Sequence, residues 1–165
     1  MKLKIKVKVI TKGCMPSINE KGDWIDLKSA VDVTLKAPQS GSLKRKTENG
    51  EQVSYRNVTM DTTYIPLGVA MKLPDGFEAV VNSRSSSPYK FKLFIPNGQG
   101  VIDNSYSGND DEWHYICSTM TKATIHKGDR ICQFRIEKNQ PTLVFKEVEE
   151  MEAEDRGGLG STGKK

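Results

Sequence analysis

Residues 1–10, MKLKIKVKVI, alternate basic and apolar side chains, with Leu3, Ile5 and Val7 on one side and lysines on the other. Successive side chains of a strand point to opposite faces, so this period of two predicts a half-buried β-strand. Similar apolar runs follow along the chain: 31–36 (VDVTLK), 64–73 (YIPLGVAMKL), 77–83 (FEAVVNS), 91–95 (FKLFI), 113–118 (WHYICS), 131–137 (ICQFRIE) and 142–148 (TLVFKEV).

Turn signals separate these runs. Asn49-Gly50, Pro74-Asp75-Gly76 and Lys127-Gly128-Asp129 combine residues that preset or permit the dihedral angles of a tight turn. No segment keeps the apolar spacing of an amphipathic helix over three turns, so helix is expected only as a short piece after Pro88. The pattern predicts an all-β sandwich or barrel with little helix.

The length of 165 residues favours a single domain with a tail. With 36% hydrophobic and 28% charged residues, and no apolar run near the roughly 20 residues that span a bilayer, we expect a soluble protein without a transmembrane helix. The first ten residues lack the apolar block of a secretory signal. The 25 basic and 21 acidic residues are mixed along most of the chain, so the net charge of +4 does not predict direct binding to nucleic acid.

Three cysteines, Cys14, Cys117 and Cys132, are an odd number at wide spacings. This argues against a disulfide framework and favours a reducing cytoplasm. Cys117 and Cys132 lie in strand patterns, where a buried, inert thiol is the commoner outcome, although the sequence leaves a Cys-His nucleophile pair open. His114 and His126 lack the spacing of a zinc site.

Two stretches depart from the strand pattern. Residues 40–62 are polar and rich in turn residues, and we interpret them as a hairpin or an inserted loop. Residues 149–165 contain an acidic run, an arginine and a Gly-Ser-Thr segment, with little to bury. The predicted organisation is a β-barrel over 1–148 and a flexible C-terminal arm over 149–165.

The Gly-rich end of the arm matches a phosphate-binding motif only in part. Residues 158–164, GLGSTGK, match part of a phosphate-binding P-loop, but Lys165 stands where Ser or Thr is needed. No strand and helix can flank this segment as that mechanism requires. Its amides and hydroxyls can still wrap a phosphate as a flexible lid.

Polar residues at strand ends are the remaining candidates for chemistry. Arg84-Ser85-Ser86-Ser87-Pro88 places a guanidinium beside hydroxyls and turn amides, which suits an oxygen-rich anion, although taken alone it is more often an ordinary Ser-rich turn. Gln133 lies among hydrophobes in a strand pattern. Asp155-Arg156 offers a mobile arginine, useful where negative charge develops on a phosphoryl group, or else a solvated tail.

The stretch Asn97 to Gly108, NGQGVIDNSYSG, combines glycines with a carboxylate and a tyrosine in a predicted hairpin. Glycines let a flat ligand approach the backbone closely, so a base edge can be read without side chains. Asp103 can activate a water or help to hold a metal. A plain β-hairpin is an equally good interpretation of this stretch by itself.

Taken in order, these segments resemble the five motifs of the homotrimeric dUTPase family. Gly22 to Leu27 (GDWIDL) is similar to the first motif, Arg84-Ser85-Ser86 to the second, Asn97 to Gly108 to the third, Gly128 to Gln133 to the fourth and Arg156 to Gly163 to the fifth. The compact form with GDWIDL and DRGG is most similar to dUTPases of Gram-positive bacteria and their phages. The resemblance implies a jelly-roll or distorted β-barrel that hydrolyses dUTP to dUMP and pyrophosphate with Mg²⁺, which keeps uracil out of DNA and supplies dUMP for dTMP synthesis.

The resemblance also implies roles for individual residues. Asp103 would activate the attacking water at the α-phosphorus, and Tyr106 would lie beneath the deoxyribose and exclude a 2′-hydroxyl. Uracil would be read by the hairpin residues Asn97, Gly98, Gly100, Val101 and Ile102.

The phosphates would be held by residues of four other motifs. Asp26 would anchor waters of the magnesium shell. Ser85 and the amide of Ser86 would hold the phosphate chain, supported by Arg84, and Gln133 would bind a phosphate oxygen. Arg156 would act as an arginine finger on the γ-phosphate, and the lid that closes over the nucleotide would comprise Leu159, Gly160, Ser161 and Thr162.

These roles fit the chemistry of the reaction. Hydrolysis at an α-phosphorus needs a positioned water, charge compensation and exclusion of bulk water. Mg²⁺ takes most of its ligands from phosphate and water, so a sequence with few clustered carboxylates suits it. The family builds its site from three subunits, with the arm of one closing over a pocket formed by two others. Such sharing explains an arm with no core of its own.

Three departures from the family pattern stand out. Leu159 replaces the aromatic residue that stacks over the base, and leucine can cover uracil but not stack on it, unless another ring such as Trp113 compensates. Trp24 stands where a small residue is common. The segment 40–62 is longer than the compact form of the family requires, and the resemblance implies no catalytic role for it.

Two alternatives remain open from the sequence. A dCTP deaminase shares the Arg-Ser-Ser element and the fold, but the 97–108 hairpin and the arginine arm favour pyrophosphate release. The second is an additional regulatory role, since phage-type dUTPases can bind other proteins, with residues 40–62 as the candidate surface.

Overall fold

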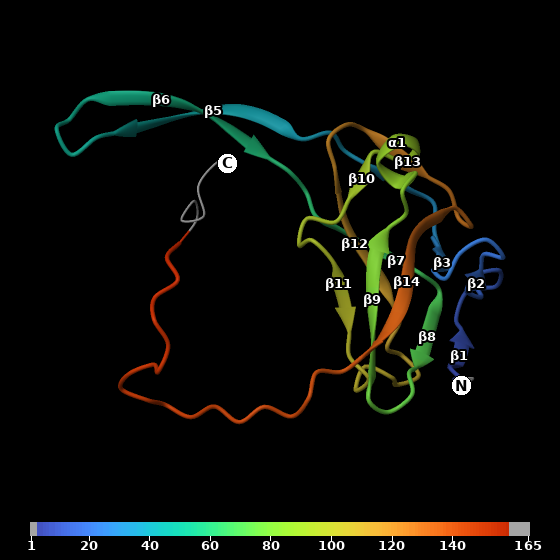
Figure 1. The fold of residues 1–165 in the computed structure, drawn as a ribbon. Helices are drawn as coiled ribbons and strands as arrows, with labels where there is room; N and C mark the ends of the chain where they lie inside the picture. The colour runs from blue at the N-terminus through green and yellow to red at the C-terminus, as the bar shows by residue number, and fades with distance from the viewer. Residues whose placement is uncertain (1–2, 159–165) are drawn as a thin grey trace.

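The computed structural model describes residues 3–158, which form a β-barrel with a long hairpin and a C-terminal arm projecting from it (Figure 1). Every strand pairing is antiparallel. The strands are β1 (Lys6–Val9), β2 (Ser17–Ile18), β3 (Ile25–Lys28), β4 (Val33–Leu35), β5 (Gln39–Lys46), β6 (Gln52–Thr59), β7 (Thr63–Pro66), β8 (Val69–Lys72), β9 (Phe77–Ser83), β10 (Leu93–Phe94), β11 (Gly100–Ile102), β12 (His114–Thr119), β13 (Ala123–Ile125) and β14 (Arg130–Lys138).

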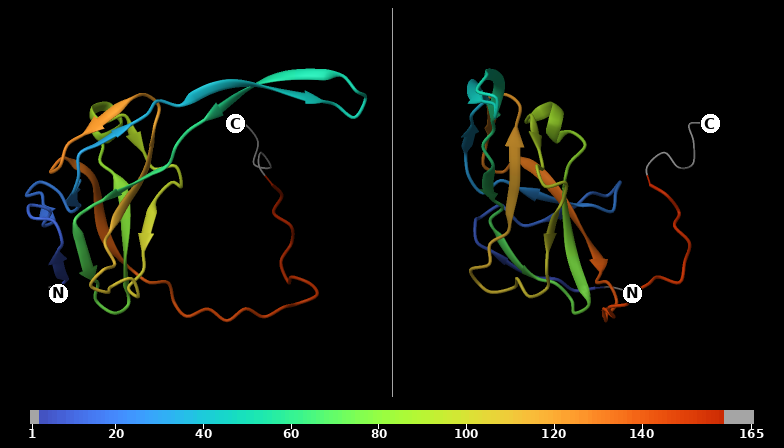
Figure 2. Two further views of the ribbon diagram at one scale, coloured as in Figure 1. Left: turned by 180° about the vertical axis from the view of Figure 1, so that it is seen from behind. Right: turned by 90° about the vertical axis from the view of Figure 1, so that its left-hand side faces the viewer.

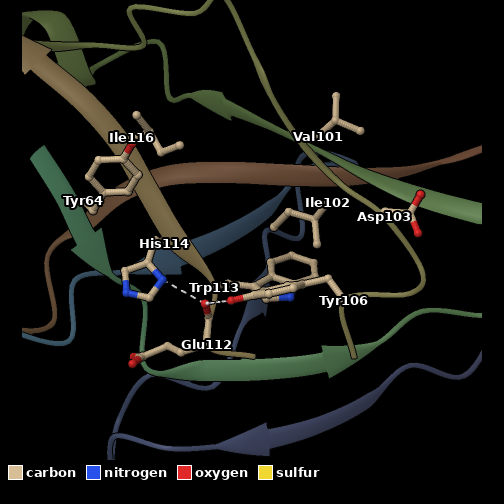
Figure 3. A pocket seen from close by; sticks show the side chains of 9 residues that line it. All are labelled: Tyr64, Val101, Ile102, Asp103, Tyr106, Glu112, Trp113, His114 and Ile116. Carbon is tan, nitrogen blue, oxygen red and sulfur yellow. Dashed lines mark hydrogen bonds between the residues drawn. The ribbon is translucent and has the colours of Figure 1, made fainter. Parts of the chain in front are cut away.

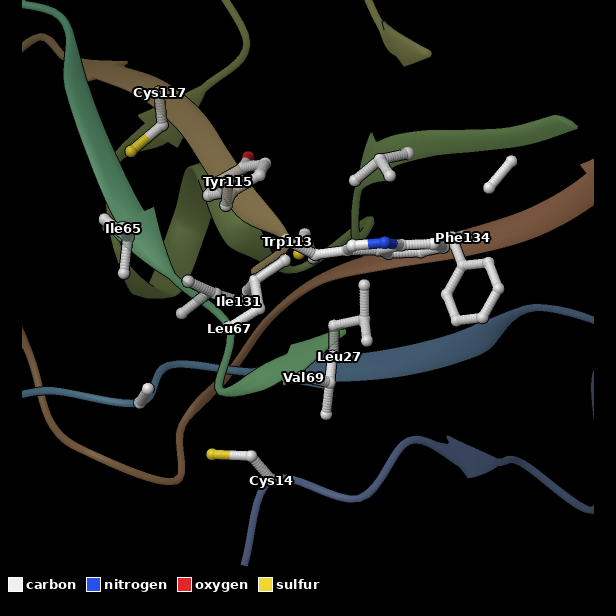
Figure 4. Close-up of a cluster of buried hydrophobic side chains, with 14 of the residues drawn as sticks. Cys14, Leu27, Ile65, Leu67, Val69, Trp113, Tyr115, Cys117, Ile131 and Phe134 are labelled. Atoms are coloured by element: carbon white, nitrogen blue, oxygen red, sulfur yellow. The ribbon is translucent and has the colours of Figure 1, made fainter. Parts of the chain in front are cut away.

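The barrel is built from small sheets around one core. The largest has the order β11-β9-β14-β3-β2, and a three-stranded sheet has the order β10-β12-β7. Between them the ring of Trp113 meets that of Phe134 edge-on, with centroids 5.1 Å apart and an interplanar angle of 77°. Leu27, Ile65 and Tyr115 belong to the same buried cluster, all at most 1% exposed (Figure 4). The predicted all-β class with little helix is confirmed.

The predicted N-terminal strand is shorter than its alternating pattern. β1 begins at Lys6, and Leu3 and Val9 are 38% and 43% exposed. β1 pairs only with β8, so its apolar side packs on the barrel from one edge and is covered incompletely.

The predicted strand at 142–148 is wrong for this chain. The last strand ends at Lys138, the amide of Asn139 donates to the carbonyl of Gly76, and residues 140–158 form no strand or helix. Val144 and Phe145 are about nine-tenths exposed. A strand pattern becomes a strand only when it pairs with another edge through N–H and C=O groups, and in this structure residues 142–148 pair with no edge.

The short helix expected near Pro88 is confirmed as α1 (Ser87–Lys90), with proline in its first turn, where no backbone donor is needed. Among residues 3–158 no helix has the length and apolar character needed to cross a membrane.

The buried thiols predicted at Cys117 and Cys132 are also confirmed, and Cys14 is buried as well. Cys14, Cys117 and Cys132 are free and at most 1% exposed. Burial raises the pKa of the Cys117 thiol to about 12 and also raises the pKa of Cys14 and Cys132. Thiols that stay protonated at neutral pH make a Cys-His nucleophile pair untenable here.

Residues 40–62 form a hairpin. β5 and β6 pair from Gln39 opposite Thr59 to Lys46 opposite Gln52, and they extend well away from the barrel (Figure 2). Gly50 closes the turn with a φ of 82°, and its amide donates to the carbonyl of Thr47 at 2.9 Å.

Candidate functional site

A cavity of about 400 Å³ lies beside the end of β11, and we call it the hairpin pocket. Its walls are mostly apolar and aromatic, with Asp103 at one end (Figure 3). This mixture of apolar walls and a few polar groups is typical of a small-molecule site. The lining residues are Tyr64, Val101, Ile102, Asp103, Tyr106, Glu112, Trp113, His114 and Ile116.

Asp103 directly follows β11 and is exposed at the mouth of the hairpin pocket. Its Oδ1 accepts a hydrogen bond from the backbone N–H of Ser105 at 2.7 Å. This bond and a second one from the Ser105 side chain lower the pKa of the carboxyl below its usual value. Asp103 is therefore ionised at neutral pH and can accept a proton from, and orient, a bound water.

Tyr106 and His114 meet at one backbone oxygen. The hydroxyl of Tyr106 donates to the carbonyl of Glu112 at 3.2 Å, and Nδ1 of His114 lies 2.8 Å from the same oxygen (Figure 3). This bond fixes the tyrosine ring across the hairpin pocket. The Asp103 loop is anchored separately, because Nδ2 of Asn104 donates to the carbonyl of Pro74 at 2.8 Å.

The predicted hairpin over residues 97–108 is wrong, because β11 lies at the edge of its sheet next to β9 alone and pairs with neither β10 nor β12. Only one side of its backbone is used in the ladder, so N–H and C=O groups on the other side are available to a ligand. A small cavity of about 70 Å³ opens between β11 and β12, and Asn97, Gly100 and Val101 are among its lining residues. This arrangement suits recognition of a flat polar edge by backbone groups.

Asp26, Arg84 and Arg130 form a second group, which we call the arginine cluster. Nε of Arg84 donates to Oδ1 of Asp26 at 2.7 Å, and a terminal nitrogen of Arg130 donates to Oδ2 at 3.0 Å. The Asp26 side chain is 5% exposed and that of Arg130 is 50% exposed. One carboxylate facing two guanidinium groups leaves an excess positive charge near the surface, which suits an anion.

Gln133 of β14 lies next to the arginine cluster. In the sheet it is paired with Asp26 on β3 and with Asn82 on β9. Ser85 is exposed. Ser86 is the N-cap residue of α1, and its hydroxyl oxygen accepts a hydrogen bond from a terminal nitrogen of Arg84 at 3.5 Å and none from a helix amide. Ser87 holds this turn on the barrel, because its buried hydroxyl donates to the carbonyl of Ile131 at 2.7 Å.

The hairpin pocket and the arginine cluster lie at opposite ends of β9. Ile102, just before Asp103, pairs with Ala79, whereas Arg84 follows the last residue of β9, Ser83. Asp103 is therefore level with Glu78, and about six residues of extended chain, or roughly 20 Å, separate it from Arg84 along β9. No hydrogen bond or ion pair in residues 3–158 joins the two groups, so one copy of the chain does not bring all the predicted site residues together.

Arg156 lies in the exposed arm and touches neither group through a hydrogen bond or ion pair in the described part of the chain. The predicted lid residues Leu159, Gly160, Ser161 and Thr162 lie outside the described residues. Trp113 cannot replace a stacking ring in the lid, because it is fully buried against Phe134.

Sequence reasoning missed the roles of Arg130, Asn104 and Ser87. Each lies within or beside a motif that was recognised, but its partner is far away in the sequence: Arg130 binds Asp26, Asn104 binds Pro74 and Ser87 binds Ile131. Only the basic character of Arg130 beside Asp129 was available as a signal.

No group of three His, Cys, Asp or Glu side chains able to hold a metal occurs in residues 3–158. A Mg²⁺ ion held mainly by phosphate oxygens and water does not need such a group. Asp26 fits the role of holding a water molecule of the Mg²⁺ shell. Each of its two carboxylate oxygens accepts a hydrogen bond from an arginine and can accept another from a water.

Comparison with known proteins gives a consistent result. The dUTPase family model matches residues 52–163. The chain is 42% identical over 146 residues to the SPbeta prophage-derived deoxyuridine 5′-triphosphate nucleotidohydrolase of Bacillus subtilis, covering 88% of this chain and 87% of that protein. It is 31% identical to the deoxyuridine 5′-triphosphate nucleotidohydrolase of Anaplasma marginale, covering 98% and 99%.

Solved structures show the same fold. The dUTPase of Staphylococcus bacteriophage 80alpha with dUpNHpp matches with a TM-score of 0.67 and 22% identity, over 97% of this chain and 98% of that one. The dUTPase of Streptococcus mutans matches with a TM-score of 0.64 and 19% identity, over 85% and 98%. The expected jelly-roll fold is therefore confirmed, and the relatives favour dUTP hydrolysis over deamination of dCTP.

Proposed function

Because this chain belongs to the dUTPase family and is a dUTP nucleotidohydrolase, we propose that it releases pyrophosphate from dUTP at a site assembled from several copies of itself. The observation that carries this proposal is the roughly 20 Å gap, along β9, between Asp103 and Arg84. A triphosphate bound by the arginine cluster of one copy would meet the Asp103 of another. The proposed assembly is a homotrimer, as is typical of the family.

In this assembly the hairpin pocket binds the nucleoside. The free backbone edge of β11, with Asn97, reads the uracil, and the ring of Tyr106 supports the deoxyribose. The hydrogen bond from the Tyr106 hydroxyl to the carbonyl of Glu112 orients the ring, so a ribose 2′-hydroxyl would clash with it. Discrimination then depends on a fixed shape.

Asp103 orients the attacking water and takes its proton as the new bond from the water oxygen to the α-phosphorus forms and the bond from the α-phosphorus to the α,β-bridging oxygen breaks, which releases pyrophosphate. Charge on the phosphates is compensated by Arg84 and Arg130, with Ser85, the amide of Ser86 and Gln133 as hydrogen-bond donors. Asp26 holds both arginines by ion pairs, so their charges are positioned before the nucleotide binds.

Mg²⁺ is the proposed cofactor. A structural Mg(II) ion is coordinated in a mutant dUTPase from phage phi11 of S. aureus, a structural neighbour of this chain. When bound, Mg²⁺ supplies charge compensation on the phosphate oxygens. Asp26 would anchor waters of its shell.

The C-terminal arm completes the proposed site. Residues 140–158 have no fold of their own in this chain, so the arm can close over a neighbouring copy. Arg156 would then face the γ-phosphate, with Leu159, Gly160, Ser161 and Thr162 as the lid.

The central test is pyrophosphate release from a panel of deoxy- and ribonucleoside triphosphates with Mg²⁺. We expect turnover of dUTP alone, nearly abolished in Asp103→Asn with nucleotide binding retained. Complementation tests the sharing: Asp103→Asn and Arg84→Ala chains, each inactive alone, should regain activity when co-expressed. Equal turnover of UTP would contradict the role of Tyr106, and failure of complementation in mixed trimers would contradict the shared site.

We also propose a protein-binding role for the hairpin β5–β6. Phage dUTPases, among them the structural neighbour from Staphylococcus bacteriophage 80alpha, control transfer of virulence genes by a proto-oncogenic G protein-like mechanism. Here Leu43, Val53 and Tyr55 form an exposed apolar stripe on one face of the hairpin. Deletion of residues 40–62 should abolish capture of a regulatory partner while the shortened chain still hydrolyses dUTP; an unchanged set of captured proteins would contradict this role.

A further inference from the structure

The hairpin β5–β6 is a two-stranded sheet with both outer edges unpaired. Every residue of its strands is exposed except Asn57, which is partly buried. A two-stranded hairpin that packs on nothing is only marginally stable in water. Its persistence over eight residue pairs therefore calls for a partner that adds contacts along its length.

The face opposite the apolar stripe carries a row of three cations. Paired residues of an antiparallel sheet share a face, so Arg56 of β6, opposite Ser42, lies on the same face as Lys44 and Lys46 of β5. The three occupy successive levels of the hairpin, about 7 Å apart. No carboxylate of residues 3–158 forms an ion pair with any of them. We call this row the basic row.

The acidic segment 147–155 of the arm has the matching spacing. Glu150, Glu152 and Glu154 alternate along the chain, so they fall on one side when the segment is extended, again about 7 Å apart. The segment is exposed, and within residues 140–158 the arm makes no hydrogen bond or ion pair to the barrel. Its nine residues extended reach about 30 Å, comparable with an eight-residue strand.

We propose that the hairpin is the docking site for the acidic arm segment of a second copy of this chain. The segment lies along one edge of the hairpin, its three carboxylates on the same face as the basic row, and the unpaired backbone of that edge adds hydrogen bonds. The docked segment directly precedes Arg156 in the sequence, so docking limits the space that this arginine searches before the lid closes. The inference rests on the proposed sharing of the arm between copies.

Cross-linking between two populations of chains tests this directly. Chains carrying Ser54→Cys on the hairpin are co-expressed with chains carrying Val148→Cys on the arm, and a short bis-maleimide joins them without nucleotide. The native cysteines are at most 1% exposed and do not react. We expect a dimeric product at low salt and its loss at high salt, because exposed ion pairs are screened.

Charge reversal then identifies the contact. Lys44→Glu/Lys46→Glu/Arg56→Glu should lower the yield about tenfold, the effect expected of three exposed ion pairs. Adding Glu150→Lys/Glu152→Lys/Glu154→Lys to the arm should restore it. The matched control reverses three exposed lysines of the barrel, Lys36, Lys72 and Lys122, and should leave the yield unchanged.

Two results of the charge reversal would overturn the inference: an equal yield of cross-link after reversal of the basic row, or an equally large loss of yield in the barrel control. A chain that carries both Ser54→Cys and Val148→Cys gives a third test. A cross-link that forms only within that chain, and never between the two populations, would also overturn the inference. Turnover of dUTP separates this from the proposed function. Full dUTP hydrolysis without the cross-link would reject the docking site alone, whereas a normal cross-link without dUTP hydrolysis would reject the proposed function alone.

Discussion

Asp26 accepts a hydrogen bond from Nε of Arg84 at 2.7 Å although the two residues are 58 positions apart in the sequence. The second oxygen of the same carboxylate accepts from Arg130 at 3.0 Å. A single buried acid therefore positions two arginines, one just after β9 and one at the start of β14, and the orientation of the charges proposed to bind phosphate depends on it.

Asp26→Ala should lower the free energy of unfolding by about 2 kcal/mol, because two guanidinium groups lose their counter-charge while Arg130 stays half exposed and screened. Urea denaturation measures this. The same variant should raise KM for dUTP. Asp26→Asn keeps the shape and serves as the control; if it matched the wild type in both stability and KM, the charge of Asp26 would have no role.

The acid limb of the activity profile should report Asp103. The hydrogen bonds from Ser105 lower the pKa of the Asp103 carboxyl in the folded protein below its value in the unfolded chain. They therefore stabilise the folded protein above the unfolded pKa, and this stabilisation is lost as the pH falls through the folded pKa. Ser105→Ala removes the side-chain bond and keeps the backbone bond. We expect the acid limb of kcat/KM to move to higher pH, with the rate at neutral pH little changed; a limb that moved to lower pH would contradict this account.

Gly68 should not tolerate a side chain. A Cβ there would lie 2.8 Å from atoms of Cys14 and Thr11, and its φ of +70° is strained for other residues. Gly68→Ala should cost more than the roughly 1–2 kcal/mol of the backbone conformation alone, measured by urea denaturation. Gly13→Ala is the matched control, because its φ is +91° and nothing lies within 4 Å. Equal losses in both variants would show that the close packing at Gly68 contributes nothing.

Arg156→Ala should reduce turnover far more than binding, because an arginine finger acts mainly in the transition state and contributes roughly 10³–10⁵-fold in other phosphoryl-transfer enzymes. Single-turnover rates and the Kd of a non-hydrolysable dUTP analogue separate the two effects. Lys146→Ala, in the same exposed arm, is the control and should match the wild type. An unchanged single-turnover rate in Arg156→Ala would exclude the finger.

The sequence by itself determined the all-β class and the short helix at Pro88, and it predicted a hairpin or loop at residues 40–62 and buried thiols at Cys117 and Cys132. Each depends on local information: the period of the hydrophobic residues, turn dihedral angles, or the burial that a strand pattern implies. The motifs also identified the family, because five segments in order are a linear signal.

Only the tertiary structure decided which residues meet. The pairing of Asp26 with Arg130 and the separation of Asp103 from Arg84 follow from the order of β11, β9, β14 and β3, which no local pattern specifies. For the same reason residues 142–148 resemble a strand in sequence but stay unpaired, since a strand needs a neighbouring edge and this segment lies in none of the sheets of the described residues.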